Sequence, residues 1–325
     1  MTGSPLERDV AVNGITLRIL EQGTGPLVLL CHGWPELAYS WRHQIPALAR
    51  SGYRVVAPDM RGYGGSSVPH EVAAYAMSAL VGDVVALVAA LGETRACIVG
   101  HDWGSNVAWN AALMRPDVFV AVAALSVPFR ARNPLAAPSA VLRAAGLENF
   151  YWNYFNREGP PEAELERDLD AALRRILYSG SGDLPPDREF PVIVPPGKGF
   201  LDGTVDPAVL PAWMSAEDVA VYASAFRRTG MRGPLNYYRN IDRNWADAAP
   251  FQGARIAVPA LFVAGSRDLV IASAAGRSAL EAMPQHVPGL REQVLIPGAG
   301  HWIQQERPAE VEAALLRFLA AGYPA

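Results

Sequence analysis

The stretch Gly100-His101-Asp102-Trp103-Gly104 decides the fold of this 325-residue chain. It follows a short apolar run at residues 96–99 and precedes a helix-compatible segment at residues 106–113. The two glycines bracket Asp102 at the spacing of a nucleophile elbow, a sharp strand-to-helix turn that lifts one side chain above a sheet. We therefore expect Asp102 to stand at the carboxyl end of a strand and to act as a nucleophile.

The elbow carries Asp where its commonest form carries Ser. A carboxylate suits attack on an sp³ carbon that bears a leaving group, because the product is an ester of the enzyme that water can cleave. A serine alkylated in the same way would become an inert ether. Asp102 therefore predicts displacement at carbon followed by ester hydrolysis, with epoxides and alkyl halides as the two candidate substrate types.

Ester hydrolysis needs a general base that activates water and an acid that orients the base. The chain order in such a fold is nucleophile, acid, His, and two histidines follow the elbow at a distance, His286 and His301. His301 comes just after the apolar run 293–296, where strand-end loops gather catalytic groups, whereas His286 lies in a turn-like stretch. We assign the base to His301 and the orienting acid to Asp268, which follows an earlier apolar run. Asp268 has the alternative role of a helix cap.

Short apolar runs alternate with helix-length amphipathic segments along the chain, which is the pattern of a mostly parallel sheet flanked by helices. Strands are expected at residues 15–21, 27–31, 53–57, 96–99, 120–127, 259–264 and 293–296. Helices are expected at residues 41–51, 78–91, 106–113 and 308–319.

The alternation of apolar runs and helical segments stops between about Phe129 and Trp245. This region holds charged helical stretches at 162–177 and 216–229. The segment that joins them includes a loop rich in Gly and Pro at 179–203. A loop of that length is usually functional or mobile. We expect a helical cap over the carboxyl ends of the strands, where ligands of open α/β sheets bind. The predicted cap spans residues 130–245, inserted into a core made of residues 1–129 and 246–325.

Composition excludes several classes of protein. Half of the residues are hydrophobic and the net charge is −4 without a basic cluster, so a nucleic acid partner is not expected. No apolar run approaches the roughly 18 residues of a membrane helix, and residues 1–10 lack the apolar core of a secretory signal. Cys31 and Cys97 lie in apolar runs and are expected to be reduced and buried. We expect a cytoplasmic protein, as a monomer or a homodimer.

Several segments together carry a resemblance to a known family: His32-Gly33-Trp34-Pro35, Trp41-Arg42-His43-Gln44, Asp59-Met60-Arg61-Gly62-Tyr63-Gly64, the elbow and Gly300-His301-Trp302. On these residues the chain resembles the soluble epoxide hydrolases of the α/β-hydrolase fold over nearly its whole length. The resemblance implies a mostly parallel eight-stranded sheet with an inserted cap. It also implies hydrolysis of a small-molecule epoxide to a vicinal diol, with no cofactor and no metal.

Two cap segments carry the resemblance further. The segment 232–240 looks like the second-tyrosine segment of the family and places a catalytic phenol at Tyr238, while 151–155 looks like the first-tyrosine segment and places one at Tyr151. Tyr154 is a rival for the first position, since it lies on nearly the same helix face. Two phenols can hold the ring oxygen of an epoxide and supply a proton as the C–O bond breaks.

Two other functions compete with epoxide hydrolysis. A haloalkane dehalogenase uses the same Asp nucleophile, but the dehalogenases similar to this chain often carry Asn in the place of Trp34 and lack the cap tyrosine pair. A non-catalytic receptor or scaffold of this fold usually loses a member of the triad, and this chain keeps all three residues.

The remaining site residues surround the elbow. The backbone N–H groups of Trp34 and Trp103 are the expected donors to an oxyanion that forms on Asp102. The predicted pocket walls are the side chains of Trp34, Trp103, Tyr237 and Trp302. Three further polar residues are expected to be structural, namely His32, Asp59 and His101, the last as a neighbour of the nucleophile without a role in proton transfer.

Overall fold

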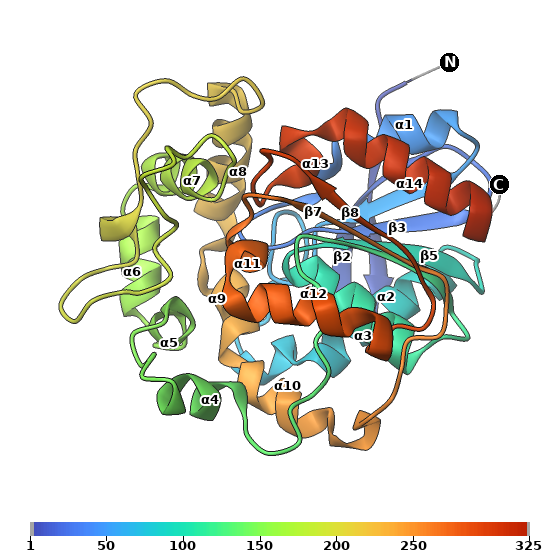
Figure 1. Cartoon of the computed structure of the whole chain (residues 1–325). Helices are drawn as coiled ribbons and strands as arrows, with labels where there is room; N and C mark the ends of the chain where they lie inside the picture. The colour runs from blue at the N-terminus through green and yellow to red at the C-terminus, as the bar shows by residue number, and fades with distance from the viewer. Residues whose placement is uncertain (1–2, 324–325) are drawn as a thin grey trace.

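A computed structural model describes residues 3–323 of the chain, built around one eight-stranded sheet (Figure 1). The strand order is β1-β2-β4-β3-β5-β6-β7-β8; β1, β2 and β4 pair antiparallel, and all other neighbours pair parallel. The strands are β1 (Leu6–Val12), β2 (Ile15–Gln22), β3 (Leu27–Cys31), β4 (Arg54–Pro58), β5 (Ala96–His101), β6 (Phe119–Leu125), β7 (Ala260–Gly265) and β8 (Leu290–Ile296). The mostly parallel eight-stranded sheet is confirmed.

The central strands are apolar throughout because both faces of the sheet are covered. In β3, Leu27, Leu29 and Cys31 belong to one buried cluster, whereas Val28 and Leu30 belong to the other. This alternation places successive side chains on opposite faces. Cys31 lies in one cluster and Cys97 in the other, and both are free buried thiols, as predicted.

Helices cover both faces of the sheet (Figure 1). Apolar residues of α1 (Gln44–Arg50) and α14 (Pro308–Gly322) join the cluster that holds Val28. Apolar residues of α2 (Met77–Ala90), α3 (Trp103–Met114) and α12 (Ala274–His286) join the cluster that holds Leu29. The short helices α11 (Leu269–Ala272) and α13 (Ile303–Glu306) lie in the loops that follow β7 and β8.

The segment between β6 and β7 is helical; α4 to α8 lie on the left in Figure 1 and α10 lies at the bottom. Its helices are α4 (Pro138–Ala144), α5 (Tyr151–Phe155), α6 (Pro160–Glu166), α7 (Leu169–Ser179), α8 (Ala216–Thr229), α9 (Arg232–Arg239) and α10 (Ile241–Asp247). The loop at 179–203 is anchored at its end, because Glu164 accepts hydrogen bonds from the amides of Phe200 and Leu201. The division into a cap at 130–245 and a core remains a prediction, and α10 continues past residue 245.

Three local expectations were wrong. Strand β1 was not predicted, because its charged residues lie on the edge of the sheet, where one row of side chains faces solvent. The helix expected at 162–177 is two helices, since Asp168 caps α7 by accepting a hydrogen bond from the amide of Ala171. His286 ends α12 and does not lie in a turn.

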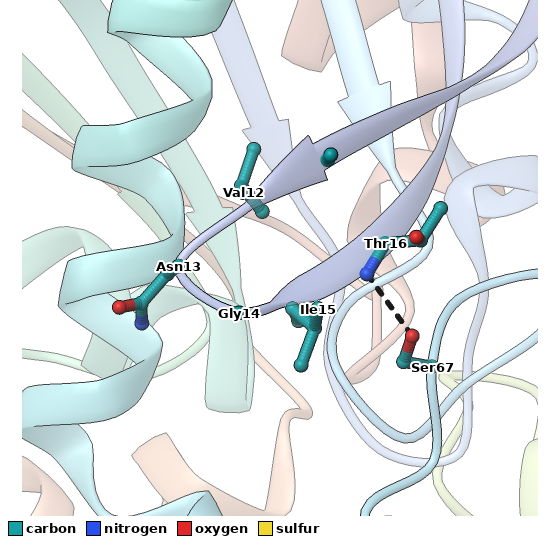
Figure 2. A pocket seen from close by; sticks show the side chains of 7 residues that line it. Val12, Asn13, Gly14, Ile15, Thr16 and Ser67 are labelled. Atoms are coloured by element: carbon teal, nitrogen blue, oxygen red, sulfur yellow. Dashed lines mark hydrogen bonds between the residues drawn. The ribbon is translucent and has the colours of Figure 1, made fainter.

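An open surface cavity of about 490 Å³ lies at the turn between β1 and β2 (Figure 2). It is lined by residues 11–16 and by Ser67, whose hydroxyl accepts a hydrogen bond from the amide of Thr16, 3.0 Å away. None of the predicted site residues lines it. Among residues 3–323, no helix combines the length and the apolar character that crossing a membrane requires.

Candidate active site

The turn from β5 to α3 has the predicted strand–turn–helix geometry. Asp102 stands between the two elements with φ 52° and ψ −117°, a backbone conformation that side-chain-bearing residues seldom adopt and that marks functional sites. A Cβ added at Gly104 would lie 2.0 Å from the carbonyl oxygen of Cys31, and one added at Gly100 would lie 2.0 Å from the carbonyl oxygen of Gly104. Both glycines are therefore required for this turn.

The two oxygens of the Asp102 carboxylate have different neighbours. Oδ1 accepts a hydrogen bond from the backbone nitrogen of Trp34 at 2.8 Å, whereas Oδ2 lies 3.4 Å from Nε2 of His301. A Cβ at Gly33 would lie 2.3 Å from Cβ of Asp102, so only glycine allows this approach. The Trp103 amide forms no hydrogen bond to the carboxylate within residues 3–323. Trp34 is thus the N–H donor that contacts Asp102.

His301 and Asp268 form a buried pair. Nδ1 of His301 lies 3.0 and 3.1 Å from the two carboxylate oxygens of Asp268, and Oδ1 of Asp268 also accepts a hydrogen bond from the amide of Val270. Asp268 therefore orients His301 and caps α11 at the same time. Burial alone would lower the pKa of His301, but the carboxylates of Asp268 and Asp102 outweigh it and raise this pKa well above its usual value.

The cap brings two tyrosines together. Tyr151 begins α5 and Tyr238 lies in α9, with ring centroids 6.0 Å apart. Burial raises the pKa of both phenols and the charge of Asp102 adds to the increase, so both keep their proton. Tyr154 donates instead to Oε2 of Glu164 at 2.7 Å, a contact within the cap. This geometry favours Tyr151 over Tyr154 as the partner of Tyr238.

The predicted pocket residues divide into two groups. The rings of Trp34 and Trp103 stand edge-on to Tyr238, with centroids 5.9 and 5.2 Å from it. Tyr237 donates its phenol proton to the carbonyl of Arg61, and Trp302 donates its indole N–H to a carbonyl of α7. The first group therefore contacts a site tyrosine, whereas the polar atoms of Tyr237 and Trp302 bind main chain.

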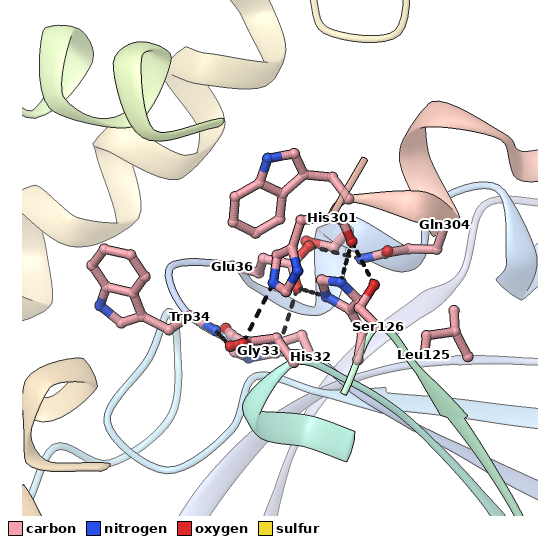
Figure 3. A network of polar contacts seen from close by, with 12 residues as sticks. His32, Gly33, Trp34, Glu36, Leu125, Ser126, His301 and Gln304 are labelled. Atoms are coloured by element: carbon pink, nitrogen blue, oxygen red, sulfur yellow. Dashed lines mark hydrogen bonds and ion pairs between the residues drawn. The ribbon is translucent and has the colours of Figure 1, made fainter. Parts of the chain in front are cut away.

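A buried polar network under the site was not predicted (Figure 3). Nδ1 of His101 lies 2.6 Å from Oε2 of Glu36, and Nε2 of the same ring lies 2.7 Å from the carbonyl oxygen of His301. This carbonyl oxygen also accepts a hydrogen bond from the hydroxyl of Ser126. Gln304 donates to Oε1 of Glu36 at 2.8 Å. Burial opposes the charge of Glu36, but His101 lowers its pKa to about 2. The network fixes the main chain of His301, and its members come from segments too far apart for a sequence motif.

Two residues that were expected to be structural make structural contacts. Nε2 of His32 accepts a hydrogen bond from the amide of Met60 at 2.9 Å. The carboxylate of Asp59 accepts from the amides of Ala38 and Gly65. Both side chains hold loops at the carboxyl ends of β3 and β4.

A nucleophile elbow on a central strand, with an acid and a His after later strands, defines a hydrolase of the α/β-hydrolase fold. The family described as alpha/beta hydrolase fold matches residues 26–308. Epoxide hydrolase A of Mycobacterium tuberculosis is 48% identical over 98% of both chains. The crystal structure of epoxide hydrolase A from Mycobacterium thermoresistibile superposes with a TM-score of 0.91, at 46% identity over 97% of this chain and 98% of that one.

An epoxide hydrolase from an endophytic Streptomyces is also 46% identical, with a TM-score of 0.93 and coverage of 98% of this chain and 96% of that one. The chain belongs to the alpha/beta hydrolase family and, within it, to the epoxide hydrolases. These relatives do not favour the haloalkane dehalogenase alternative.

Proposed function

We propose that this epoxide hydrolase converts its substrate to a vicinal diol in two steps, through an ester on Asp102. One observation carries the proposal: the carboxylate of Asp102 lies between the N–H of Trp34 and the imidazole of His301, and its charge acts on the buried phenols of Tyr151 and Tyr238. A nucleophile, a base and two proton donors are the groups that epoxide opening and ester hydrolysis require.

The first step forms the ester. A carboxylate oxygen of Asp102 attacks a ring carbon, and the bond from that carbon to the epoxide oxygen breaks. The phenols of Tyr151 and Tyr238 hydrogen-bond the epoxide oxygen as charge develops on it, and one of them transfers its proton. Because burial keeps both phenols protonated, they can supply this proton at neutral pH.

The second step hydrolyses the ester. His301, oriented by Asp268, takes a proton from water, and the hydroxide attacks the carbonyl carbon of the Asp102 ester. The negative charge then forms on the carbonyl oxygen of the ester. The N–H groups of Trp34 and Trp103 lie beside this oxygen and stabilise the charge. Collapse of this intermediate breaks the bond to the alkoxide of the diol, which takes the proton held by His301. The proton of the new Asp102 carboxyl group returns to the phenolate left by the first step, so the carboxylate and both phenols are restored.

The surroundings of the site support an apolar epoxide as the substrate class. The aromatic rings of Trp34, Trp103 and Phe155 pack around Tyr238 with centroids between 5.1 and 5.9 Å away. Our proposal also includes a cytoplasmic location, which the free thiols of Cys31 and Cys97 support, and a monomer or homodimer as the working state.

A single turnover in ¹⁸O-labelled water tests the ester mechanism. Enzyme in excess over a styrene-type epoxide should release unlabelled diol, because the oxygen that is added comes from Asp102. Repeated turnover with limiting enzyme is the control and should give labelled diol, since water has by then exchanged into the carboxylate. Labelled diol in the first turnover would mean that water attacks the epoxide directly, without an ester.

A further inference from the structure

The C-terminal end of α7 contacts the loop that carries His301. The backbone nitrogen of His301 donates to the carbonyl of Gly180 at 2.8 Å, and the indole N–H of Trp302 donates to the carbonyl of Leu177 at 2.6 Å. The cap segment 177–184 therefore hydrogen-bonds the main chain of the proposed base and the side chain of the next residue.

Glycines allow the two main chains to approach closely. A Cβ added at Gly182 would lie 2.1 Å from the carbonyl oxygen of Gly298, and one added at Gly300 would lie 2.2 Å from the backbone nitrogen of Gly182. Neither position has room for a side chain. The His301 loop and the cap segment are thus packed backbone against backbone.

The carboxylate of Glu306 joins these two main chains. Oε2 accepts hydrogen bonds from the amides of Gly300 at 2.7 Å and Gly182 at 2.9 Å, while Oε1 accepts from the amide of Trp302 at 3.0 Å. Two of the three donors flank His301, and the third belongs to the cap. Glu306 is buried and forms no salt bridge within residues 3–323. Burial raises the pKa of its carboxyl, and the three peptide N–H groups act against this increase.

Arg267 holds the same cap segment from the neighbouring loop. Its guanidinium donates to the carbonyls of Gly182 at 2.5 Å and Leu184 at 2.6 Å, and its backbone nitrogen donates to the carbonyl of Ala299. Arg267 directly precedes Asp268. The loops that carry the base and the acid are therefore both attached to residues 180–184.

We propose that Glu306 is a positioning residue for ester hydrolysis, which fixes the main chain on both sides of His301 and ties it to the cap segment at Gly182. The inference rests on the two-step function proposed above. Ester formation uses Asp102 and the cap tyrosines, whereas ester hydrolysis depends on where His301 holds the water. A displaced His301 should therefore slow the second step more than the first.

Glu306→Gln is the most informative variant, because it keeps the volume of the side chain. The amide has one oxygen and one NH₂ group, so it must direct donor hydrogens either at the amides of Gly300 and Gly182 or at that of Trp302. Asp168→Asn is the matched control. It neutralises a carboxylate that accepts a backbone N–H at the opposite end of α7, and Asn caps helices as well as Asp does.

Rapid-quench mass spectrometry with a styrene-type epoxide measures both steps, as the rise and decay of the enzyme ester. We expect Glu306→Gln to slow ester decay by about 10- to 100-fold, the effect of a small misplacement of a catalytic group, while ester formation changes by less than about twofold. The ester should then accumulate in the steady state. The control variant should keep the wild-type ratio of the two rates.

Two results would overturn the proposal: ester decay at the wild-type rate in folded Glu306→Gln enzyme, or an equal fall of both rates, which a merely structural role predicts. If the variant does not fold, Arg267→Met tests the same junction, because it removes both guanidinium hydrogen bonds to the cap segment, and it should slow ester decay selectively. An equal fall of both rates there would also contradict us. Absence of any ester in the wild-type enzyme is a different failure, because it would reject the two-step function itself.

Discussion

Nε2 of His301 lies 3.4 Å from Oδ2 of Asp102, beyond the usual hydrogen-bond separation of about 2.7–3.2 Å. On its other side, Nδ1 of the same ring lies 3.0 Å from Asp268. The imidazole is therefore hydrogen-bonded to Asp268 and lies farther from Asp102. The longer distance to Asp102 suits the proposed role of His301 as a base, because its Nε2 must bind a water molecule once Asp102 has become an ester.

Replacing His301 should separate the two steps. The variant His301→Ala keeps Asp102 and both cap tyrosines, so we expect it to form the ester but not to release it. After exposure to an epoxide, the intact mass of the protein should rise by the mass of the substrate and stay raised. An adduct that disappears as fast as in the wild type would contradict the assignment of His301 as the base, whereas an unchanged mass would reject the ester on Asp102.

The charge of Asp102 should control the protonation of His301. The carboxylates of Asp268 and Asp102 raise the pKa of His301 against the effect of burial, and ester formation removes the charge of Asp102. Asp102→Asn imitates that neutral state, so the pKa of His301 should be lower in this variant than in the wild type. Titration of the imidazole followed by NMR measures both values, and equal values would reject the coupling.

The raised pKa of His301 predicts how the stability of the fold depends on pH. The folded-state pKa of His301 is raised above the unfolded value of about 6.5, so protonated His301 stabilises the fold. This contribution is fully present below pH of about 6.5 and is lost as the pH rises through the raised folded-state pKa. Urea unfolding across this range should show a smaller pH-dependent loss in Asp102→Asn, whereas a loss of the same size would mean that other groups cause it.

The sequence predicted the elements whose residues carry a local pattern. Strands β3, β5 and β7 were found because strands buried on both faces read as continuous apolar runs. Strand β1 was missed because the consecutive charged residues Glu7, Arg8 and Asp9 interrupt its apolar pattern at the edge of the sheet. The lengths of the cap helices were harder to predict, since a single capping residue such as Asp168 divides one amphipathic stretch into two helices.

Among the site residues, too, only those with a local sequence pattern could be predicted. The positions of Asp102, Asp268 and His301 could be predicted because each follows a strand that the sequence identifies, while their catalytic roles remain a proposal. Glu36 and Glu306 could not, because their contacts join segments far apart in the chain. Glu36 contacts His101 and Gln304, and Glu306 accepts from the amide of Gly182. The contact of Glu306 with Gly182 depends on the packing of the cap on the core, and those of Glu36 depend on how loops from different strands meet.

Tyr151 and Tyr238 should both be needed for rapid ester formation, whereas Tyr154 should not. Tyr238→Phe and Tyr151→Phe each remove a proton donor that we place on the epoxide oxygen, and each should slow ester formation by about 100-fold or more, with a smaller effect on ester decay. Tyr154→Phe is the control, because that phenol donates to Glu164, and its ester formation should stay near the wild-type rate. Rapid-quench measurement of the ester separates the steps. A larger effect at Tyr154 than at Tyr151 would exchange their roles.

The buried ion pair of Arg61 and Asp83 should stabilise the fold near the site. The guanidinium binds both carboxylate oxygens, at 2.7 and 2.5 Å, and the carbonyl of Arg61 accepts the phenol proton of Tyr237. Asp83→Asn leaves the arginine charge buried without its partner, so the free energy of unfolding in urea should fall by about 3–5 kcal/mol. Asp117→Asn, in the exposed pair with Arg115, should change it little, because solvent screens that pair. Equal effects of the two variants would show that burial does not strengthen the Arg61–Asp83 pair.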